Sequence, residues 1–339
     1  MVDTFDYEAF TPKVAVVGVG GQGSNLVNRL FGNGIKSADT VALNTDIGHL
    51  NMIRAHKKLL IGKDITNGLG AGGYPEVAAK CAEVSKGEIE HALEGYDLVF
   101  IAAGMGGGTG TGAAPVVAQI AREMGATVIA TVTYPFALER SRKLKAEWGI
   151  EKLNKQADSV IVIENDRLLS YVPNLPIERA FEIVDNITGN AVKGIADTIT
   201  LPSLINLDFA DLRNVVRNTG TAVISIGSGH GPDRVEQAVR STRTHPLLTV
   251  DYENAKGALI HVVGGGNLTI KDATRIGEGV TADLAPDANV IFGARMMPEL
   301  NDQIRVMSVV TGVKAKFGEK REERTSSSPM RLEIAERIY

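Results

Sequence analysis

The segment GMGGGTGTG, residues 104–112, follows the apolar run DLVFIAA (97–103) and precedes the helix-like run AAPVVAQIAREM (113–124). Six of its nine residues are glycine and two are threonine. A tight turn with positive φ angles needs only one or two glycines. A strand, a glycine loop and a helix in succession are typical of phosphate binding, because backbone N–H groups can approach oxygen atoms and the helix N-terminus adds partial positive charge. The segment therefore predicts a phosphate-binding loop, with Thr109 and Thr111 as additional hydroxyl donors.

A second glycine loop, GVGGQG (18–23), fits the G-x-G-x-x-G pattern of dinucleotide-binding proteins, and Asp46 lies roughly 20 residues beyond it. On that motif alone, a nicotinamide-dependent oxidoreductase is an open alternative. One pyrophosphate needs one such loop, whereas two loops that face each other suit a triphosphate. No lysine follows either loop in the Walker pattern. Phosphate charge must therefore be offset by N–H groups, helix dipoles and a metal ion.

Apolar strands that alternate with helical stretches predict an α/β fold whose parallel sheet is covered on both faces. The predicted strands lie within 13–31, 38–46, 98–104, 126–136 and 158–166. Ligands bind such sheets at the carboxyl ends of the strands. Every distinctive loop follows a strand: Gly20–Asn25, Asn44–Asp46, Gly104–Gly112, Pro135–Glu139 and Asn165. We therefore expect these loops to converge on one site.

The remainder of the chain predicts a long helix and a smaller α+β domain. Residues 176–200 have apolar positions at helical spacing, and Pro176 suits a first turn. Four strands and two helical stretches follow it. The predicted organisation is a nucleotide-binding domain (1–176), a central helix (177–200), a connecting loop and helix (201–219), a C-terminal domain with a four-stranded sheet (220–315), and a flexible linker and tail (316–339).

The composition of the 339-residue chain excludes several classes of protein. The formal net charge of −4 and the pI of about 5.9 argue against a nucleic-acid binder, which normally carries a basic footprint. Cys81 is the single cysteine, so neither a disulfide framework nor a zinc site of several thiolates is expected. No apolar run reaches the roughly 20 residues of a membrane span, and the N-terminus lacks an apolar signal core. We expect a cytoplasmic protein.

GGGTGTG (106–112) resembles the signature of the tubulin/FtsZ family, and further motifs agree in order over about residues 12–315. These motifs are GGQGSN (20–25), NTD (44–46), GLGAGGYPEVA (68–78), PFALE (135–139), NDRLL (165–169) and NLDFADLRNV (206–215). The DFAD sequence and the modest length favour the FtsZ branch over eukaryotic tubulin, and Glu164 and Arg140 point to an archaeal type. The resemblance implies the tubulin/FtsZ fold. It also implies a GTPase that binds GTP or GDP with Mg²⁺, polymerises head-to-tail into protofilaments and forms the mid-cell division ring.

The resemblance also assigns nucleotide-binding residues. They are Gly20, Gly21, Gln22, Gly23, Asn25, Asn44, Asp46, Ala71, Gly72, Gly73, Gly104, Gly106, Gly107, Gly108, Thr109, Gly110, Thr111, Gly112, Pro135, Glu139, Arg142, Lys143, Asn165, Phe181 and Asp185. No direct protein ligand to a metal is among them, and Mg²⁺ is expected on the phosphates. A carboxylate that accepts from guanine N1 and N2 would reject adenine, because adenine offers no such donors.

Several of these residues have a plainer interpretation beside the implied one. Phe181 lies one helical turn before Asp185 and would stack on the base, although core packing is the alternative for this side chain. Glu139 would bind the ribose hydroxyls, with Arg142 or Lys143 near the phosphates. For these charged residues, a solvated surface is the alternative.

Asp208 and Asp211 have both a local and a functional interpretation. Locally, Asp208 is a helix N-cap and Asp211 complements the dipole in the first turn. About 15 helical residues at about 1.5 Å each, roughly 22 Å, separate Asp185 from the end of the central helix. The two aspartates can then serve catalysis only in another molecule, and repetition of that contact gives an open filament. The resemblance implies that they complete the site of the next subunit, with Asn206 shaping the loop.

Two other functions remain open from the sequence. A nucleotide-binding scaffold that assembles without hydrolysis would not need Asp208 and Asp211. The oxidoreductase would need a hydride-transfer site, and no histidine or lysine has a clear catalytic context. The end of the chain, MRLEIAERIY (330–339), is either a docking peptide for a membrane-anchoring or regulatory protein or a frayed tail. No amphipathic membrane helix is evident, so attachment to a membrane would need such a partner.

Overall fold

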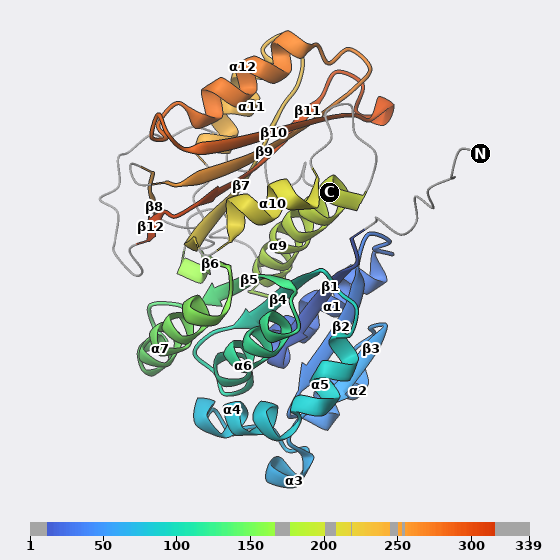
Figure 1. Cartoon of the computed structure of the whole chain (residues 1–339), viewed down its shortest axis with the longest axis vertical. Coiled ribbons are helices and arrows are strands. Elements are labelled where there is room, and N and C mark those ends of the chain that lie inside the picture. Colours follow the sequence, from blue (N-terminus) through green and yellow to red (C-terminus); the bar gives the residue numbers. More distant parts are fainter. Residues whose placement is uncertain are drawn as a thin grey trace, which may run out of the picture.

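The computed structural model of the protein describes residues 12–166, 177–200, 208–217, 219–244, 250–252 and 255–315. A ten-stranded sheet runs through it in the order β10-β9-β11-β7-β6-β5-β4-β1-β2-β3 (Figure 1). The N-terminal strands are β1 (Val14–Val19), β2 (Asp39–Asn44), β3 (Lys57–Leu60), β4 (Leu98–Gly104), β5 (Thr127–Tyr134) and β6 (Ser159–Glu164). All six run parallel, as the sequence predicts for the five strands other than β3.

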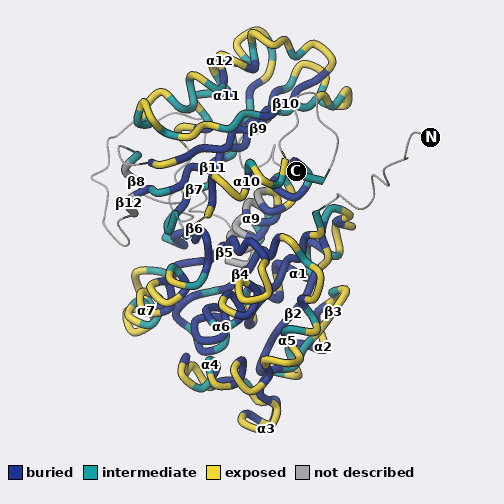
Figure 2. Tube along the Cα trace, viewed as in Figure 1, coloured by how far each residue is buried: buried dark blue, intermediate teal, exposed yellow. Residues whose placement is uncertain are grey.

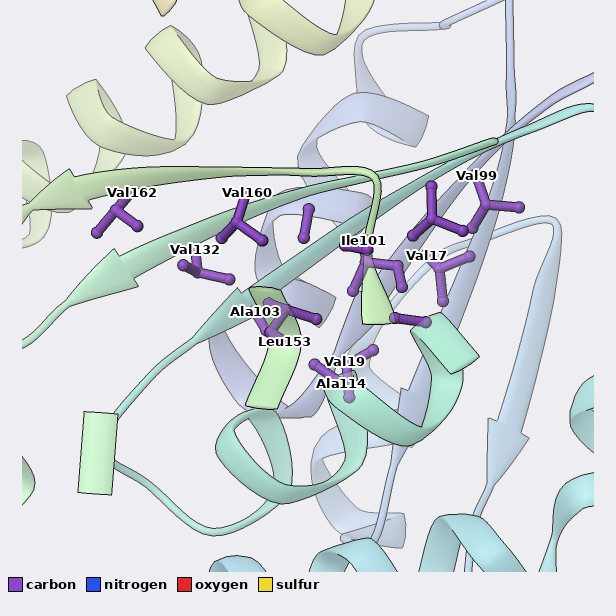
Figure 3. Close-up of a cluster of buried hydrophobic side chains, with 14 of the residues drawn as sticks. Val17, Val19, Val99, Ile101, Ala103, Ala114, Val132, Leu153, Val160 and Val162 are labelled. Carbon is purple, nitrogen blue, oxygen red and sulfur yellow. The ribbon is translucent and has the colours of Figure 1, made fainter. Parts of the chain in front are cut away.

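Both faces of this parallel sheet are covered by helices. Alternate side chains of each strand point to opposite faces, so a continuously apolar strand must bury both of them. Val17 and Val19 of β1 join one core cluster, and Val14 and Val16 join the other. Figure 3 shows part of the first cluster, where valines of neighbouring strands pack together with Ile101 and Leu153. Figure 2 shows that these central strands are buried along almost their whole length.

The helices of the N-terminal part are α1 (Gly20–Gly32), α2 (Ile47–Met52), α3 (Lys63–Thr66), α4 (Pro75–Val84), α5 (Lys86–Leu93), α6 (Thr109–Glu123) and α7 (Arg140–Gln156). The buried side chains of α1 belong to one core cluster, and those of α6 belong to the other. The helices that follow β1 and β4, two adjacent strands, therefore lie on opposite faces. The crevice where ligands bind in doubly wound sheets opens at such a reversal.

A mixed four-stranded sheet continues from β6. It consists of β7 (Gly220–Gly229), β9 (Gly257–Gly264), β10 (Asn289–Met296) and β11 (Ile304–Thr311). β11 is antiparallel to both of its neighbours, and β10 is parallel to β9. α11 (Arg234–Arg243) and α12 (Ile270–Thr281) lie on one face, while α9 (Ile177–Thr200) and α10 (Phe209–Val216) lie on the other (Figure 1).

The structure differs from the sequence prediction in how this sheet is connected. Three residue pairs between β6 and β7, Ser159–Gly220 to Ile161–Ala222, join the two sheets into one. β3 and the short pair β8 (Val250–Asp251) and β12 (Lys314–Ala315) were not predicted either. The predicted long helix is confirmed as α9, whereas residues 316–339 lie outside the described part. No described helix has the length and apolar character needed to cross a membrane.

Candidate nucleotide-binding site

The two glycine loops meet at the carboxyl ends of β1 and β4. A Cβ atom on Gly20, whose φ is +74°, would stand 2.8 Å from the backbone nitrogen of Gly110. A Cβ on Gly23 would stand 2.0 Å from the carbonyl oxygen of Ala102, so α1 also lies directly against β4. α1 and α6 begin at these loops, and neither has an acidic residue in its first turn. Two helix N-termini with uncompensated partial positive charge therefore converge here.

Most glycines of the 104–112 loop are required by packing. Gly106 has a φ of +98°, which other residues rarely adopt. Cβ atoms on Gly110 and Gly112 would stand 2.5 Å and 1.8 Å from the carbonyl oxygens of Gly104 and Pro75, respectively. At these positions a side chain would collide with backbone atoms.

Gly21 and Gly107 are different. Neither has a positive φ. Apart from the chain neighbours and, for Gly21, the nearby backbone of α1, no described atom lies within 4 Å of the place where a Cβ would stand. Folding does not require a glycine at either position. Gly21 lies in the first turn of α1 and Gly107 lies two residues before α6, so a side chain at either position would stand beside a helix N-terminus, where backbone N–H groups can bind an anion. The two residues thus fit a phosphate cradle.

The two threonines of the signature make internal hydrogen bonds. Thr109 Oγ1 lies 2.8 Å from Thr45 Oγ1. Thr111 is fully buried, and its Oγ1 accepts from the backbone nitrogen of Gly106 at 2.8 Å. In this structure the Thr111 hydroxyl accepts from the loop and braces it from inside. Its donation to a ligand stays a prediction. Gly112 is also buried, and its N–H donates to the carbonyl of Gly108 within the first helical turn.

The loop after β2 lies beside the start of α1. Asn44 is buried and its Oδ1 accepts from the backbone nitrogens of Thr45 and Asp46, at 2.9 and 3.3 Å. Asp46 caps α2 by accepting from the backbone nitrogen of His49 at 3.0 Å. His49 Nε2 lies 3.2 Å from Asn25 Oδ1 on α1. This network holds the 44–46 loop against the start of α1.

The loop before α4 lies against the signature. A Cβ on Gly108 would stand 3.1 Å from Ala71 Cβ and from the backbone nitrogen of Gly73. Gly72 and Gly73 have φ angles of +61° and +79° and are exposed, whereas Ala71 is buried. Lys145 of α7 donates to the carbonyl of Gly73 at 2.7 Å and so ties this loop to α7.

Gln22 reaches across the sheet edge from α1. Its Oε1 accepts from Thr133 Oγ1 at 2.8 Å, and a Cβ on Gly104 would collide with it. Its Nε2 is buried without a hydrogen-bond partner in the part of the chain that the structure describes. A Cβ on Gly106 would stand 3.3 Å from Pro135, which places the end of β5 beside the signature loop.

Charged residues at the start of α7 stand beside these loops. Glu139 accepts from Arg142 Nη1 at 2.5 Å and from the backbone nitrogen of Phe136 at 3.2 Å. Arg142 is exposed and its Cβ lies 2.9 Å from the Cβ position of Gly106. Lys143 Nζ lies 5.6 Å from the centre of the Tyr134 ring. Within the described residues, no three His, Cys, Asp or Glu side chains gather into a metal-binding group.

The polar residues predicted around a base lie directly after β6 and on α9. Asn165 is buried, and its Oδ1 has no hydrogen-bond partner among the described residues. Asp185 is 8% exposed and accepts from Arg29 Nη2 of α1 at 3.3 Å. Burial raises the pKa of Asp185 to about 6, against the opposing effect of Arg29. Phe181 lies one turn earlier on α9, but its side chain is outside the described part.

Asp208 and Asp211 adopt the local arrangement that their spacing predicts. Asp208 Oδ1 accepts from the backbone nitrogen of Asp211 at 2.7 Å, and Asp211 Oδ2 accepts from that of Asp208 at 3.4 Å. This capping box opens α10. Along α9, Asp185 contacts α1, whereas Thr198 lies 3.1 Å from His261 of β9. The C-terminal end of α9 therefore packs on the four-stranded part of the sheet formed by β7, β9, β10 and β11, as α10 does. Asn206 lies outside the described residues.

Two family models match the chain along its length. Residues 13–173 match the model described as "Tubulin/FtsZ family, GTPase domain", and residues 220–314 match "FtsZ family, C-terminal domain". The chain belongs to the tubulin/FtsZ family. The glycine loops that meet at β1 and β4 lie within the segment that matches this family's GTPase domain.

Relatives in this family are similar over most of the chain. Cell division protein FtsZ 2 of Methanocaldococcus jannaschii is 55% identical over 306 residues, which are 89% of this chain and 80% of that protein. Cell division protein FtsZ 2 of Halobacterium salinarum is 51% identical over 304 residues, 90% of this chain and 77% of that protein. A solved FtsZ dimer from M. jannaschii superposes with a TM-score of 0.85 at 42% identity, covering 94% of this chain and 97% of that one.

The sequence missed several residues that shape the site. Arg29 and Lys145 contact predicted site residues but lie outside the motifs, whereas Thr45 lies within the NTD motif and was not among the predicted site residues. Arg29 and Asp185 are 156 residues apart, and their contact depends on how α9 packs on α1. Thr45, between Asn44 and Asp46 in the NTD motif, was the one with a visible signal.

Proposed function

We propose that this chain is a GTPase of cell division that polymerises head-to-tail into protofilaments and forms the division ring. It binds GTP and hydrolyses it to GDP and phosphate. The convergence of two helix N-termini, with open glycines Gly21 and Gly107 in front of them, carries the proposal. Membership of the tubulin/FtsZ family supports the same function.

The phosphates occupy the space between the two glycine loops in this proposal. First-turn N–H groups of α1 and α6 bind phosphate oxygens, aided by both helix dipoles. Mg²⁺, when bound, offsets phosphate charge. Arg142 and Lys143 lie near the phosphates, and Glu139 exchanges part of its contact with Arg142 for the ribose hydroxyls.

The base lies between β6 and α9. The buried Asn165 side chain, whose Oδ1 has no hydrogen-bond partner among the described residues, and the Asp185 carboxylate bind the guanine edge, and Phe181 stacks on the ring. A buried acceptor that meets the donors of guanine N1 and N2 is left unpaired by adenine, which makes selection sharp.

Hydrolysis requires two subunits. Asp208 and Asp211 of one subunit orient and polarise the water that attacks the γ-phosphate bound by the next subunit, and Asn206 shapes their loop. A carboxylate has about four lone-pair sites, so the capping bonds leave acceptor capacity for that water. Because donor and acceptor surfaces differ, the contact repeats into an open filament.

The two domains and the C-terminal tail have separate proposed roles. The nucleotide-binding domain comprises residues 1–176, and the C-terminal domain comprises residues 220–315, with α9 between them. Residues 330–339, which follow the linker of residues 316–329, dock a membrane-anchoring or regulatory protein, which would hold the filament at the division site in the cytoplasm.

Phosphate release per molecule, measured against protein concentration, tests this function. We expect almost no release from GTP below a threshold concentration and a steep rise above it, accompanied by light scattering. ATP should support neither signal. A constant rate per molecule down to high dilution would show that each chain carries a complete site.

A further inference from the structure

Arg29 lies where α1 packs against α9. α1 begins at the first glycine loop, and the Cβ position of Gly189 on α9 is 3.2 Å from Leu30 of α1. Next to this contact, Arg29 Nη2 lies 3.3 Å from Asp185 Oδ2, and its Nη1 lies 4.0 Å from Glu182 Oε1. The guanidinium thus spans two carboxylates that are three residues apart on α9.

Asp185 is the more buried of these two carboxylates. The Asp185 side chain is 11% exposed, compared with 33% for that of Glu182. Burial raises the pKa of Asp185, and the negative charge of Glu182 acts in the same direction. Arg29 is the cation that lowers this pKa, through both its charge and its hydrogen bond. Without Arg29, every remaining influence of the described residues favours the neutral acid.

The protonation state of Asp185 decides what it can bind. An ionised carboxylate accepts at both oxygens, whereas a protonated one carries a hydroxyl donor. Guanine presents two adjacent donors, at N1 and N2. Only the ionised form meets both, and the single contact with Arg29 Nη2 leaves acceptor sites for them.

We propose that Arg29 is a positioning residue for purine selection, which holds Asp185 ionised and oriented toward the paired N–H donors of guanine. This inference rests on the proposed function. It assigns a role to a residue outside the nucleotide loops that acts on the base through a second side chain.

The test compares Arg29→Gln with Arg29→Lys. Dissociation constants for GDP and inosine diphosphate, which lacks the N2 amino group, are measured by calorimetry between pH 6 and 8.5. A neighbouring opposite charge lowers a carboxyl pKa, so its loss should raise the pKa of Asp185 well above about 6. Arg29→Gln should bind GDP about tenfold or more weakly near pH 7 and regain affinity as the pH rises. Its preference for GDP over inosine diphosphate should likewise be reduced near pH 7 and return as the pH rises.

Controls separate this role from a structural one. Arg29→Lys keeps the charge and should retain both the affinity and the flat profile of the wild type above about pH 7. In an Asp185→Asn background, Arg29→Gln should have no further effect on the GDP profile. Arg29→Met, which keeps the aliphatic stem, replaces Arg29→Gln if that variant does not fold.

The outcomes distinguish this inference from the proposed function. A loss of affinity in Arg29→Gln that is equal at every pH, or an unchanged profile, would overturn the role of Arg29 while leaving GTP binding in place. An Arg29→Lys variant that behaves like Arg29→Gln would also overturn it. If the wild-type protein binds neither nucleotide, the proposed function itself fails, and the inference fails with it.

Discussion

The backbone nitrogen of Gly110 lies 2.8 Å from where a Cβ on Gly20 would stand, so the two phosphate loops meet backbone to backbone. Side chains are excluded from that contact by geometry. They are not excluded at Gly21 and Gly107, where the surrounding space is open. The glycines of this site therefore divide into those that folding requires and those that it does not require.

This division predicts different outcomes for two substitutions in one loop. Gly107→Val should change the free energy of unfolding by less than about 0.5 kcal/mol, as surface substitutions usually do. It should nevertheless weaken GDP binding by tenfold or more, because the valine enters the phosphate space. Gly112→Ala is the matched control. It should cost about 1–3 kcal/mol of stability, because its Cβ would stand 1.8 Å from the carbonyl oxygen of Pro75.

Chemical denaturation and calorimetric titration with GDP measure these two effects. A Gly107→Val variant that binds GDP like the wild type would remove this glycine from the proposed cradle.

The aspartates of α10 allow their structural and catalytic roles to be separated. Asn is as good an N-cap as Asp, so Asp208→Asn should leave stability almost unchanged. Asp208→Ala should lose about 1 kcal/mol, because the hydrogen bond to the nitrogen of Asp211 is removed. Both variants should lower GTP turnover by roughly two orders of magnitude. Full turnover in Asp208→Asn would mean that Asp208 is only a cap.

The sequence predicted the elements of this site because each carries a local signal. Continuous apolar runs mark β1, β4, β5 and β6, and glycine clusters mark the loops that follow two of them. β3 has no such signal, since Lys57 and Lys58 of this edge strand are exposed. Its pairing with β2 depends on tertiary structure.

The contacts between distant segments could not be predicted from the sequence, because they also depend on tertiary structure. The pairing of Ser159 with Gly220 depends on where α9 and α10 return the chain. The inward orientation of Thr111, in the first turn of α6, depends on how the preceding loop places the backbone nitrogen of Gly106 beside it. Residue types and spacing identify the loops, whereas the direction of a side chain within a loop is set by packing.

We predict that acid weakens the contact between α9 and the four-stranded part of the sheet, because His261 of β9 lies in this contact. It is 4% exposed, its Nδ1 lies 3.1 Å from Thr198 Oγ1, and its Nε2 is buried with no partner among the described residues. Burial, together with the charge of Arg295, lowers the pKa of His261 to about 4, with Asp197 opposing. The unfolded chain binds this proton below about pH 6.5, so the native state should lose stability as the pH falls from about 6.5 to about 4.

The loss attributable to His261 should reach about 3 kcal/mol at the acid end of this window. His261→Asn should flatten the pH dependence of the urea midpoint between pH 4 and 6.5. His91→Gln is the control, because the side chain of His91 is 88% exposed and its replacement should leave the slope unchanged. An unaltered slope in His261→Asn would contradict this prediction.

A mixing experiment tests the shared active site most directly. Asp208→Asn binds GTP but presents a defective aspartate, and Gly107→Val presents intact aspartates but binds nucleotide poorly. Each variant alone should be nearly inactive. In an equal mixture, one of the four neighbour pairings places an intact aspartate over bound GTP, so phosphate release should recover to about a quarter of the wild-type rate. A mixture no more active than the sum of its parts would contradict catalysis between subunits.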